Sequence, residues 1–272
     1  LGNTTAERVI TSVGPEQEYF LVDKEFFDKR PDLIIAGRTI FGAAPSKGQE
    51  LDDHYFGSIK ERVACFMHEL NHELWKLGIS AKTQHNEVAP NQFELATIYN
   101  TANVATDHNQ IVMETLQKIA YRHNLVCLLH EKPFKDFNGS GKHNNWSMAT
   151  DNGVNLLEPG DNPHSNAQFL LFLSAVIKAV DVYAPLLRMA ASNTGNDHRL
   201  GGHEAPPAII SIFLGDILTD VLEKLAADKP VKVTNGVHLE VGVNTLPKLP
   251  KHLTDRNRTS PFAFTGNKFE FR

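Results

Sequence analysis

The stretch "HELNHE" has two histidines and a glutamate at the spacing of a zinc peptidase helix. It runs from His68 to Glu73 and fits the pattern H-E-x-x-H, in which the histidines bind zinc and the glutamate acts as general base. A peptidase needs that pair of histidines to face a cleft. The direction of these side chains therefore decides whether they can do this chemistry.

The surrounding helix, expected over residues 59–77, places both histidines on its polar side. At about 100° per residue, His68 and His72 fall nearly opposite the apolar face, beside Glu61 and Lys76. The apolar face consists of Ile59, Val63, Phe66, Met67, Leu70, Leu74 and Leu77. The pattern therefore favours solvated histidines over a metallopeptidase, although five residues alone leave both interpretations open.

A second set of chemically active residues alternates with apolar ones along five expected strands. Residues two apart in a strand share a face, so each strand has apolar side chains behind and polar ones in front. The front positions are Glu16 and Glu18; Glu87; Glu94; His143, Asn145 and Ser147; and Lys268, Glu270 and Arg272. A solvent-facing sheet explains any one strand. It explains five glutamates less well, because ordinary exposed faces are rich in Lys, Thr and Ser.

Carboxylates gathered on one sheet would raise each other's pKa unless cations neutralised them. Carboxylate oxygens with one imidazole favour Mg²⁺ or Mn²⁺ over zinc. Several divalent ions in one site indicate phosphoryl transfer from a nucleotide. The turn "FNGSGKH" could approach a ligand closely, but Asp136 stands where a P-loop needs its first glycine. Arg256 and Arg258 in "DRNRT" could gather phosphate charge.

The composition narrows the class of protein. The 272 residues are 41% hydrophobic and 22% charged, which suits a globular core. The net charge of -5 gives no electrostatic reason to expect nucleic acid as a partner. No apolar run approaches the roughly 20 residues that cross a bilayer, and we expect neither a signal peptide nor a membrane partner. The isolated Cys65 and Cys127 are typical of a reducing compartment, so we expect a cytoplasmic protein.

Strands and helices must position these residues, and the hydrophobic periodicity predicts where they lie. We expect strands at residues 16–22, 80–89, 92–99, 126–132, 143–149 and 268–272. We expect helices at residues 59–77, 102–124, 165–191 and about 208–227. We expect residues 229–254 to be irregular.

Six motifs, in chain order, resemble those of glutamine synthetase. "GPEQEYF" resembles the first acidic strand of that family, "NEVAPNQFEL" its paired-glutamate hairpin and "KPFKDFNGSGKHNNWSM" its glutamate loop. "HRLGGHEAP" resembles its flap, and "RNRT" and "FEFR" resemble its closing phosphate and metal strands. The segment "VGVNTLPKLPKHLTDRNRT" is similar to the bacterial type III branch. The resemblance implies an α+β fold with a curved, mainly antiparallel sheet lined with carboxylates and backed by helices. Residues 1–272 would form one catalytic domain, truncated at both ends.

The resemblance also implies roles for single residues. The metal beside the glutamate substrate would be held by Glu18, Glu87 and Glu94. The metal that bridges the ATP phosphates would be held by Glu16, His143 and Glu270. The substrate would be bound by Asn138, Gly139, Arg199 and Arg272. The nucleotide would be contacted by Asn145, Ser147, Arg258 and Lys268. The catalytic residues would be Glu204, Arg258 and Arg199.

The reaction implied by the resemblance joins ammonia to L-glutamate and converts ATP to ADP and phosphate. The γ-phosphoryl group of ATP would move onto the glutamate side chain, and ammonia would displace it from the γ-glutamyl phosphate. A closing flap would protect this intermediate from water. The cofactors would be Mg²⁺ or Mn²⁺, two or more per site. The partners would be ATP, L-glutamate, ammonium and further copies of the chain, in a ring-based dodecamer with active sites between subunits.

The sequence departs from the better-known branches at three positions. Ala263 and Lys268 stand where arginines are common, and Asn145 stands where a histidine is common. Two other functions stay open: a relative that joins glutamate to a larger amine, and a catalytically inactive structural relative. The complete acidic set argues against the inactive relative. The family's small N-terminal domain is not among these residues, so we expect this stretch alone to be poorly active; wild-type rates of ammonia incorporation would contradict that.

Overall fold

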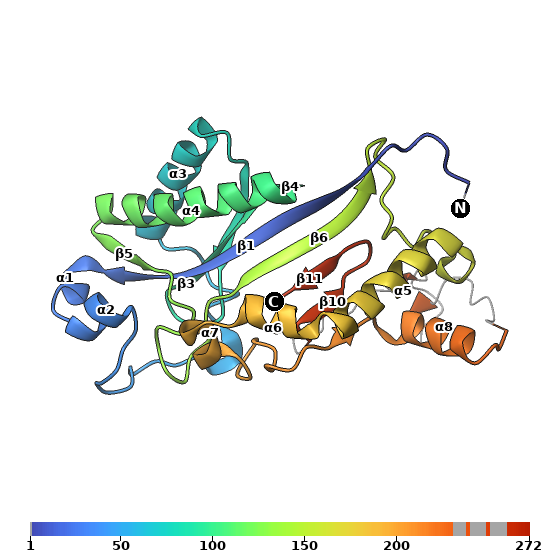
Figure 1. Ribbon diagram of the computed structural model, residues 1–272. Coiled ribbons are helices and arrows are strands. Elements are labelled where there is room, and N and C mark those ends of the chain that lie inside the picture. Colours follow the sequence, from blue (N-terminus) through green and yellow to red (C-terminus); the bar gives the residue numbers. More distant parts are fainter. Residues whose placement is uncertain (1, 231–237, 240–248, 251–259) are drawn as a thin grey trace.

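The computed structural model describes residues 2–230, 238–239, 249–250 and 260–272. Its central feature is an open, twisted sheet of nine strands in the order β2-β3-β1-β6-β11-β10-β7, with β4 and β5 also paired to β1 (Figure 1). All of these pairs are antiparallel except β10 with β7, which is parallel. The strands are β1 (Val9–Asp23), β2 (Ala81–Asn86), β3 (Gln92–Thr97), β4 (Asn100–Thr101), β5 (Leu125–Leu128), β6 (Lys142–Thr150), β7 (Ile212–Phe213), β10 (Phe262–Phe264) and β11 (Phe269–Phe271). A separate pair is formed by β8 (His238–Leu239) and β9 (Leu249–Pro250).

Strand β1 is the longest strand and extends beyond both ends of the predicted one. It has 15 residues and continues through Gly14 and Pro15, which directly precede the start predicted at residue 16. Proline lacks the N–H that a sheet ladder needs. Here, β4 pairs only as far as Val13 and β3 begins to pair at Glu16, so Pro15 lies opposite a gap in that ladder. Pro15 therefore does not interrupt β1, because no backbone N–H is needed at this position on that side of the strand.

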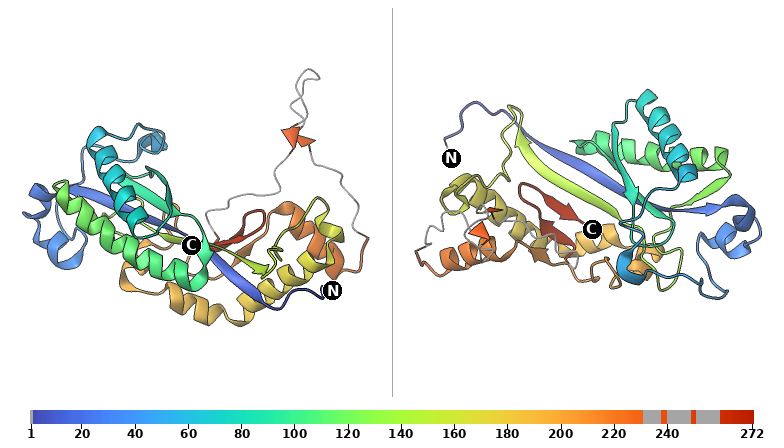
Figure 2. Two further views of the ribbon diagram at one scale, coloured as in Figure 1. Left: turned by 90° about the horizontal axis from the view of Figure 1, so that it is seen from above. Right: turned by 180° about the vertical axis from the view of Figure 1, so that it is seen from behind.

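Helices bury the apolar side of the sheet in two clusters. The helices are α1 (Lys24–Phe27), α2 (Pro31–Ala36), α3 (Glu61–Lys76), α4 (Ala102–Arg122), α5 (Ala167–Val182), α6 (Ala184–Ala191), α7 (Thr194–Arg199) and α8 (Asp216–Ala226), with 3₁₀ turns at Glu50–Asp52 and Pro163–Ser165. Helices α3 and α4 pack on Tyr19 and Phe93, whereas α5 and α8 pack on Phe269. Figure 2 shows these two helix groups at opposite ends of the molecule. The observed architecture confirms the predicted α+β class.

Two helices differ from the predicted ones. The single helix expected over residues 165–191 is two helices, α5 and α6, bent by 72°. Pro185 lies in the first turn of α6, where the missing N–H is tolerated, but it cannot continue the hydrogen bonds of α5. The helix expected from residue 208 begins only at Asp216, because residues 212–213 form β7 and Gly215 has a φ of 78°. Within the described ranges no single helix is long and apolar enough to span a membrane, and α5 with α6 passes that test only as a bent pair.

The loop after α2 is held by a buried carboxylate. Asp32 accepts hydrogen bonds from Nη2 of Arg30 at 2.6 Å and from the N–H of Ile40 at 2.9 Å. The Arg30 guanidinium lowers the pKa of Asp32 below its ordinary value of 3.8. A carboxyl group whose pKa is lower in the folded chain than in the unfolded chain stabilises the fold at pH values above the unfolded-chain pKa, here 3.8. The stabilisation is lost as the pH falls from 3.8 through the folded-state pKa.

Asp32→Ala is therefore expected to lower the urea midpoint of unfolding at neutral pH. The difference from the parent protein should shrink as the pH falls below 3.8, because the unfolded parent then takes up a proton that the folded parent, with its lower pKa, does not. Urea titrations at neutral pH and at about pH 3 measure both differences. An undiminished difference at acid pH would show that Asp32 stabilises the loop by some means other than its charge.

Candidate active site

The register of the sheet places acidic side chains directly beside one another. Glu18 of β1 lies opposite Glu94 of β3, and Glu16 of β1 lies opposite His143 of β6. Residues that face each other across antiparallel strands point to the same side of the sheet. Tyr19 of β1 and Phe93 and Leu95 of β3 are buried on the other side, as the alternation predicts. Four of the six expected metal ligands therefore meet around the middle of β1.

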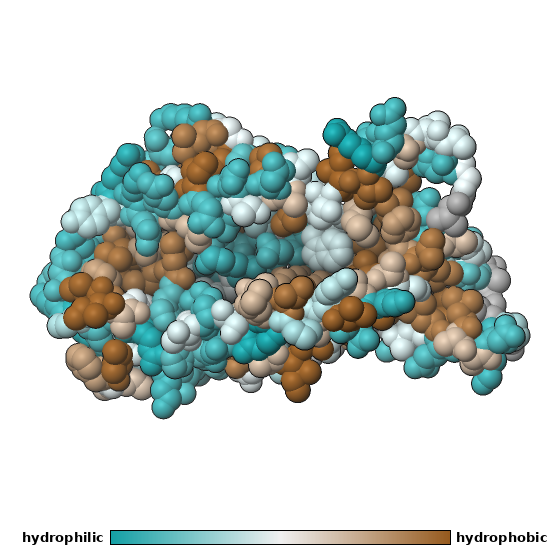
Figure 3. Space-filling model, viewed as in Figure 1, coloured by the Kyte–Doolittle hydropathy of each residue, from teal (hydrophilic) through white to brown (hydrophobic). Residues whose placement is uncertain are grey.

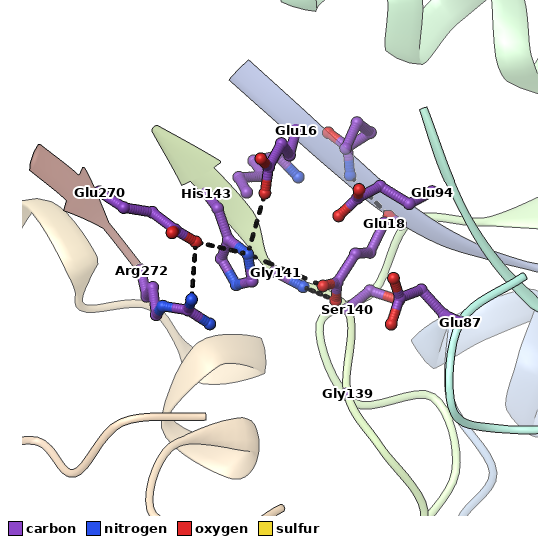
Figure 4. A network of polar contacts seen from close by, with 12 residues as sticks. Glu16, Glu18, Glu87, Glu94, Gly139, Ser140, Gly141, His143, Glu270 and Arg272 are labelled. Carbon is purple, nitrogen blue, oxygen red and sulfur yellow. Dashed lines mark hydrogen bonds and ion pairs between the residues drawn. The ribbon is translucent and has the colours of Figure 1, made fainter. Parts of the chain in front are cut away.

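His143 joins these two pairs to the acid of β11. Its Nδ1 lies 3.5 Å from Glu16 Oε2, 3.8 Å from Glu18 Oε1 and 3.6 Å from Glu270 Oε1 (Figure 4). Its Nε2 lies 3.1 Å from Nη2 of Arg199, and since a guanidinium can only donate, this contact makes Nε2 an acceptor. His143 is 5% exposed. In the neutral ring the proton therefore lies on Nδ1, the nitrogen that faces the three carboxylates. Nδ1 could serve as a ligand to a cation among them once this proton moves to Nε2 and the contact with Arg199 is released.

The sixth expected ligand, Glu87, follows β2 instead of lying in it. Its N–H donates to the carbonyl of Gln92 at 2.8 Å, in the turn that joins β2 to β3. Its carboxylate lies 3.6 Å from Nδ1 of His85, and Nε2 of the same ring lies 3.0 Å from Glu94 Oε1. Neither the alternation along the strands nor the family resemblance predicted a site role for His85. The strand register, which pairs His85 with Glu94, is the signal that would have found it.

We call the region bounded by these side chains the acidic basin; its members are Glu16, Glu18, His85, Glu87, Glu94, His143 and Glu270. Burial raises the pKa of Glu87, and the carboxylates of Glu18 and Glu94 raise it further. Burial likewise raises the pKa of Glu94, although the hydrogen bond that Glu94 accepts from His85 lowers it in part. That hydrogen bond raises the pKa of His85. The basin is thus a place where ionised carboxylates repel one another and where bound cations would relieve the repulsion.

Three groups of side chains in the acidic basin bring their ligand atoms within 4.8 Å of one another. The groups are Glu16, His143 and Glu270; Glu18, Glu94 and His143; and His85, Glu87 and Glu94. The first is the set that the resemblance assigned to the metal at the ATP phosphates. The other assigned set, Glu18, Glu87 and Glu94, is divided between the second and third groups, each of which includes a histidine. Oxygen donors with one imidazole fit Mg²⁺ or Mn²⁺.

A glycine-rich loop between β5 and β6 closes one side of the basin. The N–H of Gly141 donates to Glu18 Oε2 at 2.7 Å, and its carbonyl accepts from the N–H of Glu18 at 3.2 Å. Asn138 is 2% exposed, and its Oδ1 has no hydrogen-bond partner within the described part of the chain. A buried acceptor without a donor is costly, so this oxygen is suited to an ammonium group on a ligand. At Gly139 a Cβ atom would lie 2.4 Å from the carbonyl oxygen of Glu131, which explains the glycine.

Two buried arginines border the basin. Arg199, the last residue of α7, is 4% exposed and also donates to Oδ1 of Asn196 at 3.1 Å. Arg272 lies with its Nη2 2.9 Å from Glu270 Oε1, and its Nε has no hydrogen-bond partner among the residues described. Guanidinium donors in this position suit a carboxylate or phosphate group. Figure 3 shows a hydrophilic hollow near the centre of this face, over β1 and β6.

The two expected nucleotide contacts on β6 have hydrogen-bond partners within the chain. Nδ2 of Asn145 donates to Glu16 Oε1 at 2.8 Å, so this residue positions an acid of the basin. The hydroxyl of Ser147 lies 2.7 Å from Oδ1 of Asn155 and 3.0 Å from the carbonyl of Asn267. A nucleotide would have to compete with these two partners for Ser147.

The remaining predicted site residues have different positions. Lys268 is half-buried directly before β11, and Glu204 is half-buried in the turn after α7. Arg258 lies outside the described residues. Ala263 is fully buried and pairs with Glu270 across β10 and β11, so the side chain missing at this position would have pointed to the basin side of the sheet.

The helix with "HELNHE" lies apart from the basin, as its apolar pattern predicts. His68 and His72 are exposed on α3, with ring centroids 4.6 Å apart. Glu69 accepts hydrogen bonds from Arg122 at 2.8 Å and His123 at 2.7 Å and so ties α3 to α4. Neither exposed histidine belongs to a cation-holding group in the described ranges. The expectation of solvated histidines is confirmed.

Comparison with known proteins identifies the family of the chain. A family model described as "Glutamine synthetase, catalytic domain" matches residues 3–210. The chain belongs to the glutamine synthetase family. It is 60% identical over 270 residues to the glutamine synthetase of Butyrivibrio fibrisolvens, a match that covers 99% of this chain and 38% of that protein. It is 53% identical over 272 residues to the type-3 glutamine synthetase of Dictyostelium discoideum, covering 100% of this chain and 37% of that protein.

The chain thus spans less than two fifths of the length of these glutamine synthetases. The identity to the Dictyostelium protein agrees with the resemblance to the type III branch. Among solved structures, the cryoEM structure of Plasmodium falciparum glutamine synthetase superposes with a TM-score of 0.62 at 18% identity, covering 98% of this chain and 47% of that one. A GmaS/ADP complex superposes with a TM-score of 0.59 at 20% identity, covering 97% and 49%. At these identities the solved structures confirm the fold alone.

Proposed function

We propose that the intact protein joins ammonia to L-glutamate, forming L-glutamine with the conversion of ATP to ADP and phosphate. The observation that carries the proposal is the convergence of five glutamates and two histidines, from segments far apart in sequence, in one basin. An inactive structural relative has no need of buried acids that raise each other's pKa. Membership of the glutamine synthetase family supports the same reaction.

The residues of the acidic basin would form two cation sites for this reaction. Glu16, His143 and Glu270 would hold one cation, and Glu18, Glu87 and Glu94 with His85 would hold the other. Bound Mg²⁺ or Mn²⁺ would neutralise charge at the phosphoryl group that ATP transfers. This transfer would convert the glutamate side chain into an acyl phosphate, from which ammonia displaces phosphate.

The substrate glutamate would lie between the glycine loop and the arginines. The unpartnered Oδ1 of Asn138 would accept from its ammonium group, and Arg199 would bind its α-carboxylate. Loading the substrate would require Arg199 to exchange its contact with His143 for the carboxylate. The free Nε of Arg272 would bind substrate or phosphate. Glu204, on the turn after α7, would be the flap acid that takes a proton from ammonium so that the resulting ammonia can attack, and Arg258 would stabilise phosphoryl charge.

The extent of the domain and its assembly are part of the same proposal. The family match ends at residue 210, yet β10 and β11 continue the sheet beside β6, so we infer that residues 1–272 belong to one domain. Ile35, Leu51 and Phe56 are 85%, 95% and 82% exposed, and their burial against another copy of the chain would be favourable. A ring-based homo-oligomer, and the cytoplasm as its location, agree with the family and stay predictions.

The reaction is tested by incubating the full-length protein with L-glutamate, ammonium and ATP in the presence of Mg²⁺ or Mn²⁺. We expect glutamine and phosphate in equal amounts, and neither product when the divalent ion or ATP is omitted. The same assay with methylamine and with polyamines tests the second candidate, a ligase for larger amines. Product from a larger amine, with none from ammonium, would favour that ligase. If none of the amines gave an ATP-dependent product, both candidate functions would be contradicted.

Manganese is expected to raise the melting temperature of the protein. A ligand that binds only the folded state stabilises it by RT ln(1 + [L]/Kd), about 2.7 kcal/mol at a hundredfold excess over Kd. Thermal unfolding with manganese and with a chelator measures the shift, and Glu87→Ala should reduce it. A melting temperature that is unchanged by manganese would contradict the proposed cation sites, whatever the activity of the sample.

A further inference from the structure

A second cavity lies on the other side of the glycine-rich loop from the acidic basin. Its volume is about 930 Å³, within the range usual for small-molecule sites. Its walls are the end of β1, the loop after α2 and the segment between β5 and β6. Aromatic and aliphatic side chains make up much of the lining, among them Phe20, Phe41, Phe134 and Phe137. A pocket of this size and composition can bury most of a small organic molecule.

The charged residues of this cavity are nearly all basic. Its lining includes five cationic residues and one acid, in a chain whose net charge is -5. They are Arg30, Arg38, Lys47, Lys132 and Lys135, with Asp136 as the acid. Arg30 and Lys47 are paired with carboxylates, and Lys132 donates to the carbonyl of Phe137. Arg38 and Lys135 have no ion pair in the part of the chain described here, so their charges can act on a ligand.

The walls of the cavity are fixed by hydrogen bonds before any ligand arrives. The N–H and hydroxyl of Thr39 lie 2.8 and 3.1 Å from the carbonyl of Pro133. The buried Asp32 holds Ile40, and Oε1 of Gln49 accepts from the N–H of Asn138. The bonds of Thr39 and Gln49 join the loop after α2 to the segment between β5 and β6. A preformed cavity loses less entropy when it binds a ligand.

The cavity and the basin use opposite sides of the same two segments. Phe137 lines the cavity, whereas the next residue, Asn138, belongs to the proposed substrate site. His198 lines the cavity, whereas Arg199 contacts His143 in the basin. The cavity is therefore separate from the proposed catalytic site, and no residue of the acidic basin lines it.

We propose that this cavity binds a small organic anion with a flat apolar body. Arg38 and Lys135 bind its anionic group, and the phenylalanines contact its body. A neutral ligand would forgo the charge-assisted contacts with these two cations, and a bare inorganic anion would leave the aromatic walls uncovered. The inference goes beyond the proposed reaction and does not depend on it.

The test uses full-length protein and anilinonaphthalene sulfonate, an aromatic sulfonate whose fluorescence rises in apolar surroundings. We expect saturable binding that weakens at high salt. Arg38→Ala and Lys135→Ala should each weaken it by about five- to tenfold, the loss expected for one charge-assisted contact. Arg8→Ala, which removes an exposed arginine just before the far end of β1, should leave the affinity unchanged. Lys135 is exposed, so its variant tests the proposal even if Arg38→Ala disturbs folding.

Three results would overturn the proposal. One is an affinity that is the same in the parent protein, Arg38→Ala and Lys135→Ala. Another is full competition by ATP with manganese, which would place the probe in the acidic basin. The last is the lack of saturable binding by a folded protein. None of these results bears on glutamine formation, so the two proposals can fail separately.

Discussion

Glu87→Ala is expected to lower metal-dependent phosphoryl transfer by at least about 10²–10³-fold, the usual loss when one group that stabilises developing charge is removed. Glu87 is 5% exposed and belongs to the third cation-holding group, beside His85 and Glu94. Without it, that group keeps one carboxylate and one imidazole, which is too few for a hard divalent ion. Phosphate release from ATP by the full-length protein, measured over a range of manganese concentrations, tests this.

Glu69→Ala is the matched control, because it also removes a glutamate but outside the basin. Glu69 joins α3 to α4 through Arg122 and His123, and those contacts lower its pKa. The variant should unfold more easily but keep a near-normal rate per folded molecule. Equal loss of rate in Glu69→Ala and Glu87→Ala would favour a catalytic role for the α3 histidines. It would contradict a specific role of the acidic basin in phosphoryl transfer.

Gly141→Ala is expected to lower the same rate by about 10²-fold, the size of loss that follows a displacement of about 1 Å at a catalytic site. A Cβ atom at this position would lie 2.4 Å from Nε2 of His143 and 2.6 Å from Nη2 of Arg199. Cβ contacts below 3.0 Å essentially do not occur in proteins, so both side chains must move, or the loop must. Either movement disturbs the ligand atoms around Nδ1 of His143. Manganese affinity and rate, measured together, should both fall.

Gly14→Ala is the control for this substitution. Gly14 also lies in the central sheet, but its nearest neighbour would be Cβ of Tyr99 at 3.4 Å, an ordinary contact. We expect its rate and manganese affinity to stay within about threefold of the parent. If Gly14→Ala were as inactive as Gly141→Ala, the cause would be a general intolerance of the sheet to an added methyl group and not the collision with His143 and Arg199.

The sequence alone determined which residue types face the site. Alternation along β1, β3, β6 and β11 assigned Glu16, Glu18, Glu94, His143 and Glu270 to the polar side, and the structure confirms each assignment. The apolar face of α3 likewise predicted exposed histidines. These are local properties, because the direction of a side chain follows from a period of two in a strand and about 3.6 in a helix.

The tertiary structure decided which of these residues meet. Strand register pairs Glu18 with Glu94 and brings in His85, and neither follows from the periodicity of one strand. The loop that holds Gly141 against Glu18 joins positions 123 residues apart. Periodicity also missed the break between α5 and α6 and the strand β7, which depends on its partner β10. A strand's own sequence fixes the face on which a side chain lies, but the distance between two side chains depends on which strands pair and in what register, and that is set by the packing of the whole chain.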